Sequence, residues 1–189
     1  IWGILSGITY LYTKVDYIRM CKAMIPIWIN TIATNSSAGT IPITLDVVTD
    51  KLKVPMSIAS FSVPLGATIN LTGAALYKTI LAFFVAEIYG LDMTLSQTAM
   101  IITISTIMSI AAPGIPGGGI VTGAIFLNLM GLPMDMMGPI AGMYRLIDMS
   151  HTTVNVSGDV LGTLLVAKNE HIWNNDMFVE DHGSEEINV

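Results

Sequence analysis

The stretch from Ala67 to Phe84, ATINLTGAALYKTILAFF, places polar residues in a segment that is otherwise apolar enough to enter a lipid bilayer. Asn70 and Lys78 are the clearest of these, because lipid penalises polar groups that lack a partner. Part of this stretch, TINLTG (68–73), is matched later in the chain by TVNVSG (153–158). Both read threonine, apolar, asparagine, apolar, hydroxyl, glycine, which predicts two related structural units.

The composition indicates a membrane protein. The chain is 52% hydrophobic and 12% charged, whereas a soluble domain usually carries about 25% charged residues. Six of the fourteen acids lie from Glu170 onward, so the other eight balance the eight Lys and Arg. We expect residues 169–189 to form an acidic, disordered cytoplasmic tail. No feature suggests a nucleic-acid partner, and the lone Cys21 cannot form an internal disulfide.

Two segments predict re-entrant helical hairpins. In the first, residues 23–48, two apolar arms flank the small polar sequence SSAGT (36–40), and each arm is shorter than the ~20 residues of a membrane span. In the second, residues 95–132, two apolar arms flank APGIPGGG (112–119), where prolines and glycines cannot continue an α-helix. Residues 1–12 read as the end of a membrane helix, and because they open without a methionine we expect a piece of a longer protein.

Two longer helices complete the predicted all-α membrane fold. Residues 56–91 are long enough to span a bilayer, but Pro64, Gly66 and Gly73 should interrupt the helix. Residues 138–167 should form one long final transmembrane helix.

The basic residues predict the orientation. Threading places these on one side: Lys14, Arg19, Lys22, Lys51, Lys53 and Lys168. The opposite loops, around Asp92 and Asp135, carry no Lys or Arg, so the basic side and the carboxy terminus should be cytoplasmic. The two hairpins then enter from opposite sides and form an inverted repeat. Such repeats meet near the bilayer midplane in secondary transporters, where broken backbone coordinates ions and substrate.

Five polar residues form one stripe along the final helix. At 3.6 residues per turn, their spacing of 0, +3, +4, +7 and +11 places them on a single face; they are Asp148, His151, Thr152, Asn155 and Asp159. Carboxylates there are costly unless they face a polar cavity. The alternative is a helix–helix interface held by hydroxyls and amides.

Catalysis fits the sequence poorly, so we do not expect an enzyme. An aspartyl protease would need its carboxylates roughly 3 Å apart, whereas Asp148 and Asp159 lie about 16 Å apart on one helix. GIPGGG lacks the ending of a phosphate-binding loop. An ion channel is the stronger alternative, since re-entrant hairpins also build selectivity filters.

Four sequences together resemble the dicarboxylate/amino acid:cation symporter family, in its carboxy-terminal transport domain. They are SSAGT, PLGATIN (64–70), GIPGGG (114–119) and DMSHTTVNVSGD (148–159). The resemblance covers residues 1–168 and implies sodium-coupled symport of an amino acid across the plasma membrane. It also implies an elevator mechanism, in which this domain moves past lipid and a separate scaffold domain that holds a homotrimer together.

The resemblance implies binding roles for named residues. The α-carboxylate of the substrate would contact Ser37, Thr152 and Asn155, and its α-ammonium would contact Asp148. Gly114, in the lid, and His151 would also contact the substrate. One sodium ion would bind backbone oxygens of Gly66, Asn70 and Asn155 and the carboxylate of Asp159. Another would bind carbonyls of Thr68, Ser109, Ile110 and Ala112. Such all-oxygen sets suit a hard cation.

Four positions depart from the family pattern. Ala74 stands where members that carry acidic substrates have a threonine. His151 stands where members that carry acidic substrates have an arginine, and one imidazole does not replace a bidentate clamp. We therefore expect a neutral amino acid, with an acidic amino acid or a C4-dicarboxylate as alternatives. Thr72 replaces an aspartate that helps to bind a further sodium. Lys78 replaces a glutamine or a proton-carrying glutamate, so its ammonium could replace a transported cation, or its side chain could reach an interface.

One further cation is not assigned by the resemblance. Arg145 should pair either with a carboxylate or with a hairpin tip, and the sequence leaves both open.

Overall fold

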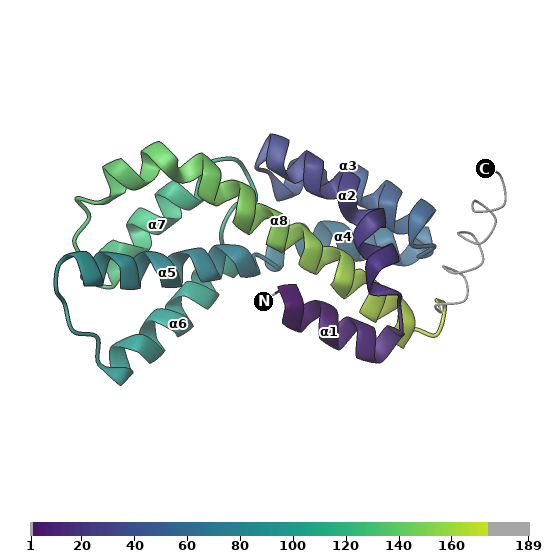
Figure 1. Ribbon diagram of the computed structural model, residues 1–189, viewed down its shortest axis with the longest axis horizontal. Coiled ribbons are helices and arrows are strands. Elements are labelled where there is room, and N and C mark those ends of the chain that lie inside the picture. The colour runs from purple at the N-terminus through teal and green to yellow at the C-terminus, as the bar shows by residue number, and fades with distance from the viewer. Residues whose placement is uncertain (1, 174–189) are drawn as a thin grey trace.

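The computed structural model describes residues 2–173, which contain helices and connecting loops and no strand (Figure 1). The predicted tail therefore lies almost entirely outside the described residues. In chain order the helices are α1 (Trp2–Thr13), α2 (Tyr17–Thr34), α3 (Ser37–Asp46), the π-helical turn η1 (Val47–Lys51), α4 (Met56–Ile69), α5 (Thr72–Ile88), α6 (Leu95–Ile110), α7 (Gly118–Leu129) and α8 (Met137–Asn169).

Helix α8 joins two groups of helices that follow one another along its length (Figure 1). α1, α2, α3 and α4 surround its carboxy-terminal part. α5 and α7 lie beside its amino-terminal part, and α6 packs on α5. Each group has a hydrophobic core of its own. The first core includes Met24, Ile27, Val48 and Leu164. The second includes Leu81, Val85, Phe126 and Leu127.

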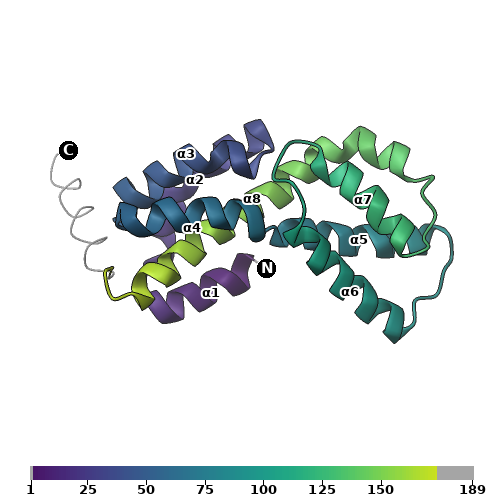
Figure 2. The ribbon, with the colours of Figure 1, turned by 180° about the vertical axis from the view of Figure 1, so that it is seen from behind.

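Both predicted hairpins have the expected helix–tip–helix form. α2 packs against α3, and Asn35, in the left-handed region at φ 53°, ends α2. Ser36 then caps α3 by accepting a hydrogen bond from the N–H of Gly39 at 3.0 Å. α6 and α7 are joined by the glycine-rich tip, which ends at Gly117 with φ 77°. Figure 2 shows the two tips side by side near the middle of α8.

The first hairpin begins earlier than expected. Asp16 accepts a hydrogen bond from the N–H of Arg19 at 2.9 Å and so caps the start of α2. The helix therefore starts inside the charged patch and is 18 residues long. An aspartate before a helical segment is a strong start signal, and it outweighs the local lack of apolar residues.

The broken helix is present, but its break lies at another position than predicted. α4 ends at Ile69 and α5 begins at Thr72, with Asn70 and Leu71 in non-helical backbone between them. Pro64 lies inside α4, where the loss of a single backbone hydrogen bond does not end the helix. Gly66 also lies inside α4, and it is the close approach of Asp159 that requires a glycine there.

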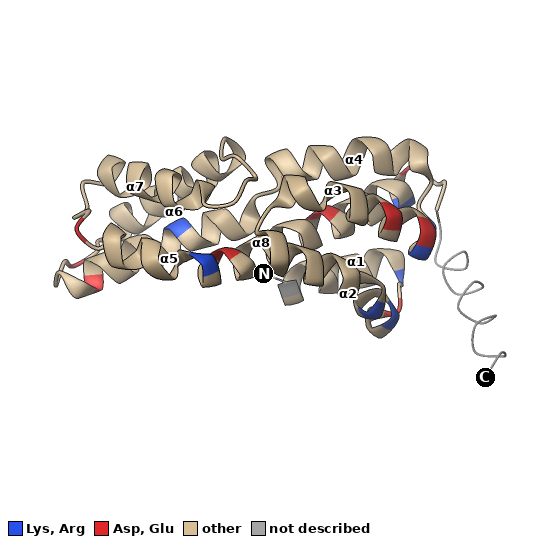
Figure 3. Cartoon of the chain, turned by 90° about the horizontal axis from the view of Figure 1, so that it is seen from above, with Lys and Arg blue, Asp and Glu red and all other residues tan. Residues whose placement is uncertain are grey.

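The charges gather at the two ends of the molecule (Figure 3). Lys and Arg lie at the end where α1 gives way to α2, as the threading predicted, together with some acids. The opposite end carries Asp and Glu only, and further basic and acidic residues lie between the two ends, on α5 and α8.

Much of the outer surface is apolar. Phe61, Leu95 and Leu146 are each at least two-thirds exposed. Among the described residues, one stretch, Met56–Ile88, is long and apolar enough to cross a membrane, with a mean hydropathy of 1.5.

Candidate ion and substrate site

The two hairpin tips contact each other directly. The hydroxyl of Ser36 and the backbone N–H of Ala38 both donate to the carbonyl oxygen of Gly114, at 3.0 and 3.2 Å. A side chain at Gly114 would lie 3.1 Å from the carbonyl of Ala67 and 3.4 Å from Cβ of Ser37. The second tip therefore fits between the first tip and the end of α4, and a side chain at position 114 would require its neighbours to move by a few tenths of an ångström.

Asp148 lies beneath the tips, buried and surrounded by donors. The N–H of Gly117 reaches its Oδ2 at 3.2 Å, so the second tip is also tied to α8. The hydroxyl of Thr152 donates to Oδ1 at 3.1 Å, and Nε2 of His151 lies 3.1 Å from the same oxygen. The carboxylate thus joins the second tip to the polar stripe.

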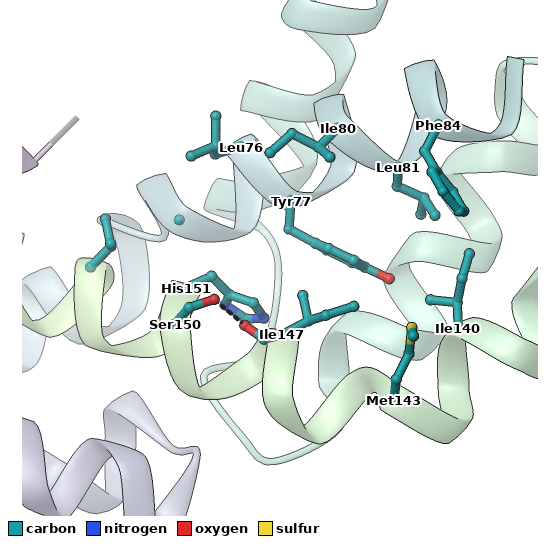
Figure 4. A pocket seen from close by; sticks show the side chains of 12 residues that line it. Leu76, Tyr77, Ile80, Leu81, Phe84, Ile140, Met143, Ile147, Ser150 and His151 are labelled. Atoms are coloured by element: carbon teal, nitrogen blue, oxygen red, sulfur yellow. Dashed lines mark hydrogen bonds between the residues drawn. The ribbon is translucent and has the colours of Figure 1, made fainter. Parts of the chain in front are cut away.

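His151 is held between two tyrosines. The hydroxyl of Tyr144 lies 2.8 Å from Nε2 of His151, and the ring of Tyr77 stacks on the imidazole with centroids 5.7 Å apart. Figure 4 shows His151 and Tyr77 at one end of an apolar cavity between α5 and α8, where Phe84 and Ile140 also point inward. The imidazole therefore separates the polar cavity of the tips from this apolar one.

The two copies of the repeated sequence contact each other reciprocally. Oδ1 of Asn155 accepts a hydrogen bond from the N–H of Gly73 at 2.7 Å. In the other direction, Nδ2 of Asn70 donates to the carbonyl of Asn155 at 3.2 Å and lies 2.5 Å from where a side chain at Gly158 would begin. Each asparagine therefore contacts the glycine of the other copy. Asn70, in the opening stretch, is thus satisfied by the other copy of the repeat.

The four residues of the first predicted sodium set converge. Nδ2 of Asn70 donates to Oδ1 of Asp159 at 2.9 Å as well as to the carbonyl of Asn155. A side chain at Gly66 would lie 2.6 Å from Oδ1 of Asp159. The carboxylate, itself 4% exposed, thus lies against the break between α4 and α5, and the amide of Asn70 joins it to the carbonyl oxygen of Asn155.

The second predicted sodium set is only partly brought together. Ser109 and Ile110, at the end of α6, line a cavity with Thr72 and the helix break. Ala112 instead lines the small cavity between the tips, and its N–H donates to the carbonyl of Ser109 at 3.2 Å. The side chain of Thr68 is exposed and donates to the carbonyl of Leu65.

Lys78 is fully buried within the helical bundle. Its Nζ lies 3.5 Å from the carbonyl of Ala74, one turn earlier on α5. Ala74 lines the cavity between the tips. The ammonium group therefore lies beside a residue of that cavity. The alternative in which the lysine side chain extends to an interface does not agree with this burial.

Two residues at the site escaped the sequence reasoning. Tyr144 precedes Asp148 by four residues, so the same periodicity that found the stripe could have found it. Asn35 gave no such signal, because its place in the cavity depends on how α2 docks on α8. Its Nδ2 donates to the carbonyl of Arg145 at 2.9 Å. Nη2 of Arg145 in turn donates to the carbonyl of Ala33 at 3.1 Å, so this arginine pairs with the hairpin tip.

The sequence matches a known protein family over most of its length. The model of the sodium:dicarboxylate symporter family matches residues 1–169. The chain belongs to this family. Symporter relatives cover most of the chain at about one-third identity. Mouse excitatory amino acid transporter 5 is 35% identical over 184 residues, 97% of this chain, and mouse excitatory amino acid transporter 3 is 34% identical over 165 residues, 87% of this chain. An excitatory amino acid transporter of Caenorhabditis elegans is 33% identical over 159 residues, 84% of this chain.

The matched region is a fraction of each symporter relative. It spans 32% of the length of each of these three proteins. The chain therefore corresponds to about a third of a transporter of this family.

Proposed function

We propose that this chain is the substrate- and ion-binding part of a sodium-coupled amino acid symporter of the plasma membrane. The supporting observation is the meeting of both hairpin tips, the break between α4 and α5, and the polar stripe of α8 at one place. Broken backbone beside buried carboxylates supplies what a transporter needs, namely oxygens for cations and charged groups for a zwitterion.

The substrate would lie between the tips and α8. The carboxylate of Asp148 would pair with the α-ammonium, and the α-carboxylate would be bound by the polar groups of Ser37, Thr152 and Asn155. These residues line one cavity with Gly114, and its water-accessible volume is ≈ 20 Å³, about enough for a single water molecule. An amino acid would therefore enter only when the tip that carries Gly114 moves away, which makes this tip the lid.

Sodium would bind at the two predicted sets of oxygens. The first set, around Asp159, is supported by the closeness of Gly66 and Asn70 to its carboxylate and by the bond from Asn70 to the carbonyl of Asn155. For the second, the carbonyls near Ser109 would have to come together with that of Thr68, which implies movement of the tip. Substrate and ions would thus depend on the same lid.

A neutral amino acid fits the site better than an acidic one. His151 takes the place expected for a clamping arginine, and its Nε2 is already engaged by Asp148 and Tyr144. An acidic amino acid is the second candidate, because the family is named for dicarboxylates and the relatives for excitatory amino acids. A protonated His151 could bind such a side chain at low pH.

The wider mechanism follows from the family. The described helices would move as the carrier of an elevator against a scaffold formed by the rest of the protein, in a homotrimer. With the basic end on the cytoplasmic side, the carboxy terminus would also be cytoplasmic. Thr72 donates to Oδ1 of Asn70 and brings no carboxylate, while Lys78 brings a buried ammonium. Both changes favour fewer coupled cations.

Uptake by the full-length protein in liposomes tests this proposal. A panel of labelled amino acids is offered with and without an inward sodium gradient. Saturable uptake of at least one of them, dependent on the gradient, is expected. Sodium conductance without saturable uptake would identify the ion-channel alternative and refute symport.

A further inference from the structure

The cavity between the tips is lined by two residues that carry buried, unpaired polar atoms. Oδ1 of Asn35 and Nδ1 of His151 have no hydrogen-bond partner among the described residues, and both residues line this cavity. A buried polar atom without a partner is costly, because it has lost its hydrogen bonds to water. Native proteins contain few such atoms, and each calls for an explanation. Here the shared location points to a ligand.

The amide of Asn35 has a fixed orientation. Its Nδ2 donates to the carbonyl of Arg145 at 2.9 Å, and the reversed amide would place two carbonyl oxygens against each other. The backbone of Asn35 is left-handed, with φ 53° and ψ 37°, a conformation that asparagine tolerates better than most residues. The unpaired atom of Asn35 is therefore an oxygen, which can only accept a hydrogen bond.

The unpaired atom of His151 is an acceptor in one tautomer of the ring and a donor in the other. Nε2 lies 3.1 Å from a carboxylate oxygen of Asp148 and 2.8 Å from the hydroxyl of Tyr144. The carboxylate can only accept, whereas the hydroxyl can donate or accept, so the contacts allow the proton on either ring nitrogen. The oxygen of Asn35 is therefore the acceptor that remains in both tautomers after Asp148 has been assigned to the α-ammonium.

We infer that the substrate carries a hydrogen-bond donor on its side chain, a hydroxyl or a carboxamide, and that Asn35 recognises it. This inference rests on the proposed function and names the substrate class for the same cavity. A side-chain carboxylate has no proton to donate and would be repelled by the oxygen of Asn35. An aliphatic side chain would leave that oxygen unpaired, and sites built to bind a donor discriminate strongly against analogues that lack it.

The test compares nearly isosteric substrates in liposomes that contain the full-length protein. Threonine and valine differ by a hydroxyl against a methyl, and asparagine and leucine differ by an amide against an isopropyl group. The ratio of transport efficiencies, threonine to valine, should be about tenfold or more in the wild type. In Asn35→Gly, which keeps the left-handed backbone, this ratio should fall towards one while valine uptake persists.

A matched variant separates recognition from support of the tip. Arg145→Met removes the bond to the carbonyl of Ala33 but leaves the backbone carbonyl that Asn35 contacts. This variant should retain the threonine preference.

Several results would overturn the inference. For the wild type, these are equal uptake of threonine and valine or best uptake of an acidic amino acid. For the variants, they are an unchanged threonine-to-valine ratio in Asn35→Gly, or a fall of this ratio in Arg145→Met as large as in Asn35→Gly. If Asn35→Gly proves inactive, the two wild-type comparisons decide. Absence of sodium-dependent uptake of any amino acid would instead refute the proposed function itself.

Discussion

The side-chain oxygen of Asn155 accepts a hydrogen bond from the backbone N–H of Gly73, over 2.7 Å. The donor lies in the first turn of α5, where helix geometry leaves N–H groups without a partner. One copy of the repeated sequence thus caps the helix of the other, and Asn70 makes the reverse contact with the copy on α8. The break in the membrane segment is therefore stabilised by the element that also carries the site.

Glycine at position 73 should be essential for folding. A side chain there would collide with the backbone carbonyl of His151, and neither backbone can yield without moving α5 from α8. Gly73→Ala should therefore lower the stability of the full-length protein by roughly 1–3 kcal/mol or more, measured as the melting temperature in detergent.

Gly162→Ala is the control for this substitution. It lies on α8, where a side chain would meet nothing within 4 Å, and in the described part of the fold it should be neutral or slightly stabilising. Equal melting temperatures for the two variants would contradict the close contact between the repeats.

Replacing His151 should change the substrate class. In His151→Arg the guanidinium can bind a carboxylate with two parallel hydrogen bonds, so uptake of glutamate or aspartate should rise at least tenfold relative to neutral amino acids. Competition between labelled and unlabelled amino acids gives this ratio. If the wild type already prefers acidic substrates, the assignment of a neutral substrate is wrong.

The buried ammonium of Lys78 should affect ion coupling. Lys78→Gln replaces the ammonium with an uncharged polar group. An additional bound cation would then be needed to balance the negative charge of the site. We expect a steeper sodium dependence or a new dependence on pH, read from initial uptake rates. Lys53→Gln, in the loop after η1, is the control. Identical profiles for Lys78→Gln and the wild type would count against a role as a built-in cation.

Joining the two tips should stop transport. Cβ of Ser37 lies 3.4 Å from where Cβ of a residue at position 114 would begin, close to the usual spacing in a disulfide. In a Cys21→Ala background, the pair Ser37→Cys and Gly114→Cys should lose uptake on oxidation and regain it on reduction. Full uptake by the completely oxidised protein would mean that the tip is not a lid.

Sequence periodicity found the polar stripe because helix geometry alone decides which residues share a face. The importance of Asp148 and Asp159 could be predicted without knowledge of the fold, since two carboxylates on one apolar helix require a polar environment. The location of the break was harder. Prolines and glycines mark both interruptions and close contacts, and Gly66 proved to be a contact with Asp159 rather than an interruption.

The remaining parts of the site depend on docking. Arg145 pairs with the carbonyl of Ala33 only because α2 ends beside α8, and no local pattern sets that distance. The role of Asn35 also depends on docking, because its neighbours in the sequence do not reveal that this residue lines a cavity. Contacts between side chains of distant segments therefore cannot be predicted from one sequence alone.

The coupling between sodium and amino acid binding tests the central claim most directly. The proposed function places both ligands on one stripe beneath one lid, so each should strengthen binding of the other by the same factor. The dissociation constant of the best substrate is measured for the full-length protein in detergent, in sodium and in choline salts. We predict at least tenfold tighter binding in sodium, and a loss of this difference in Asp159→Asn. Equal affinities of the wild type in the two salts would contradict the account.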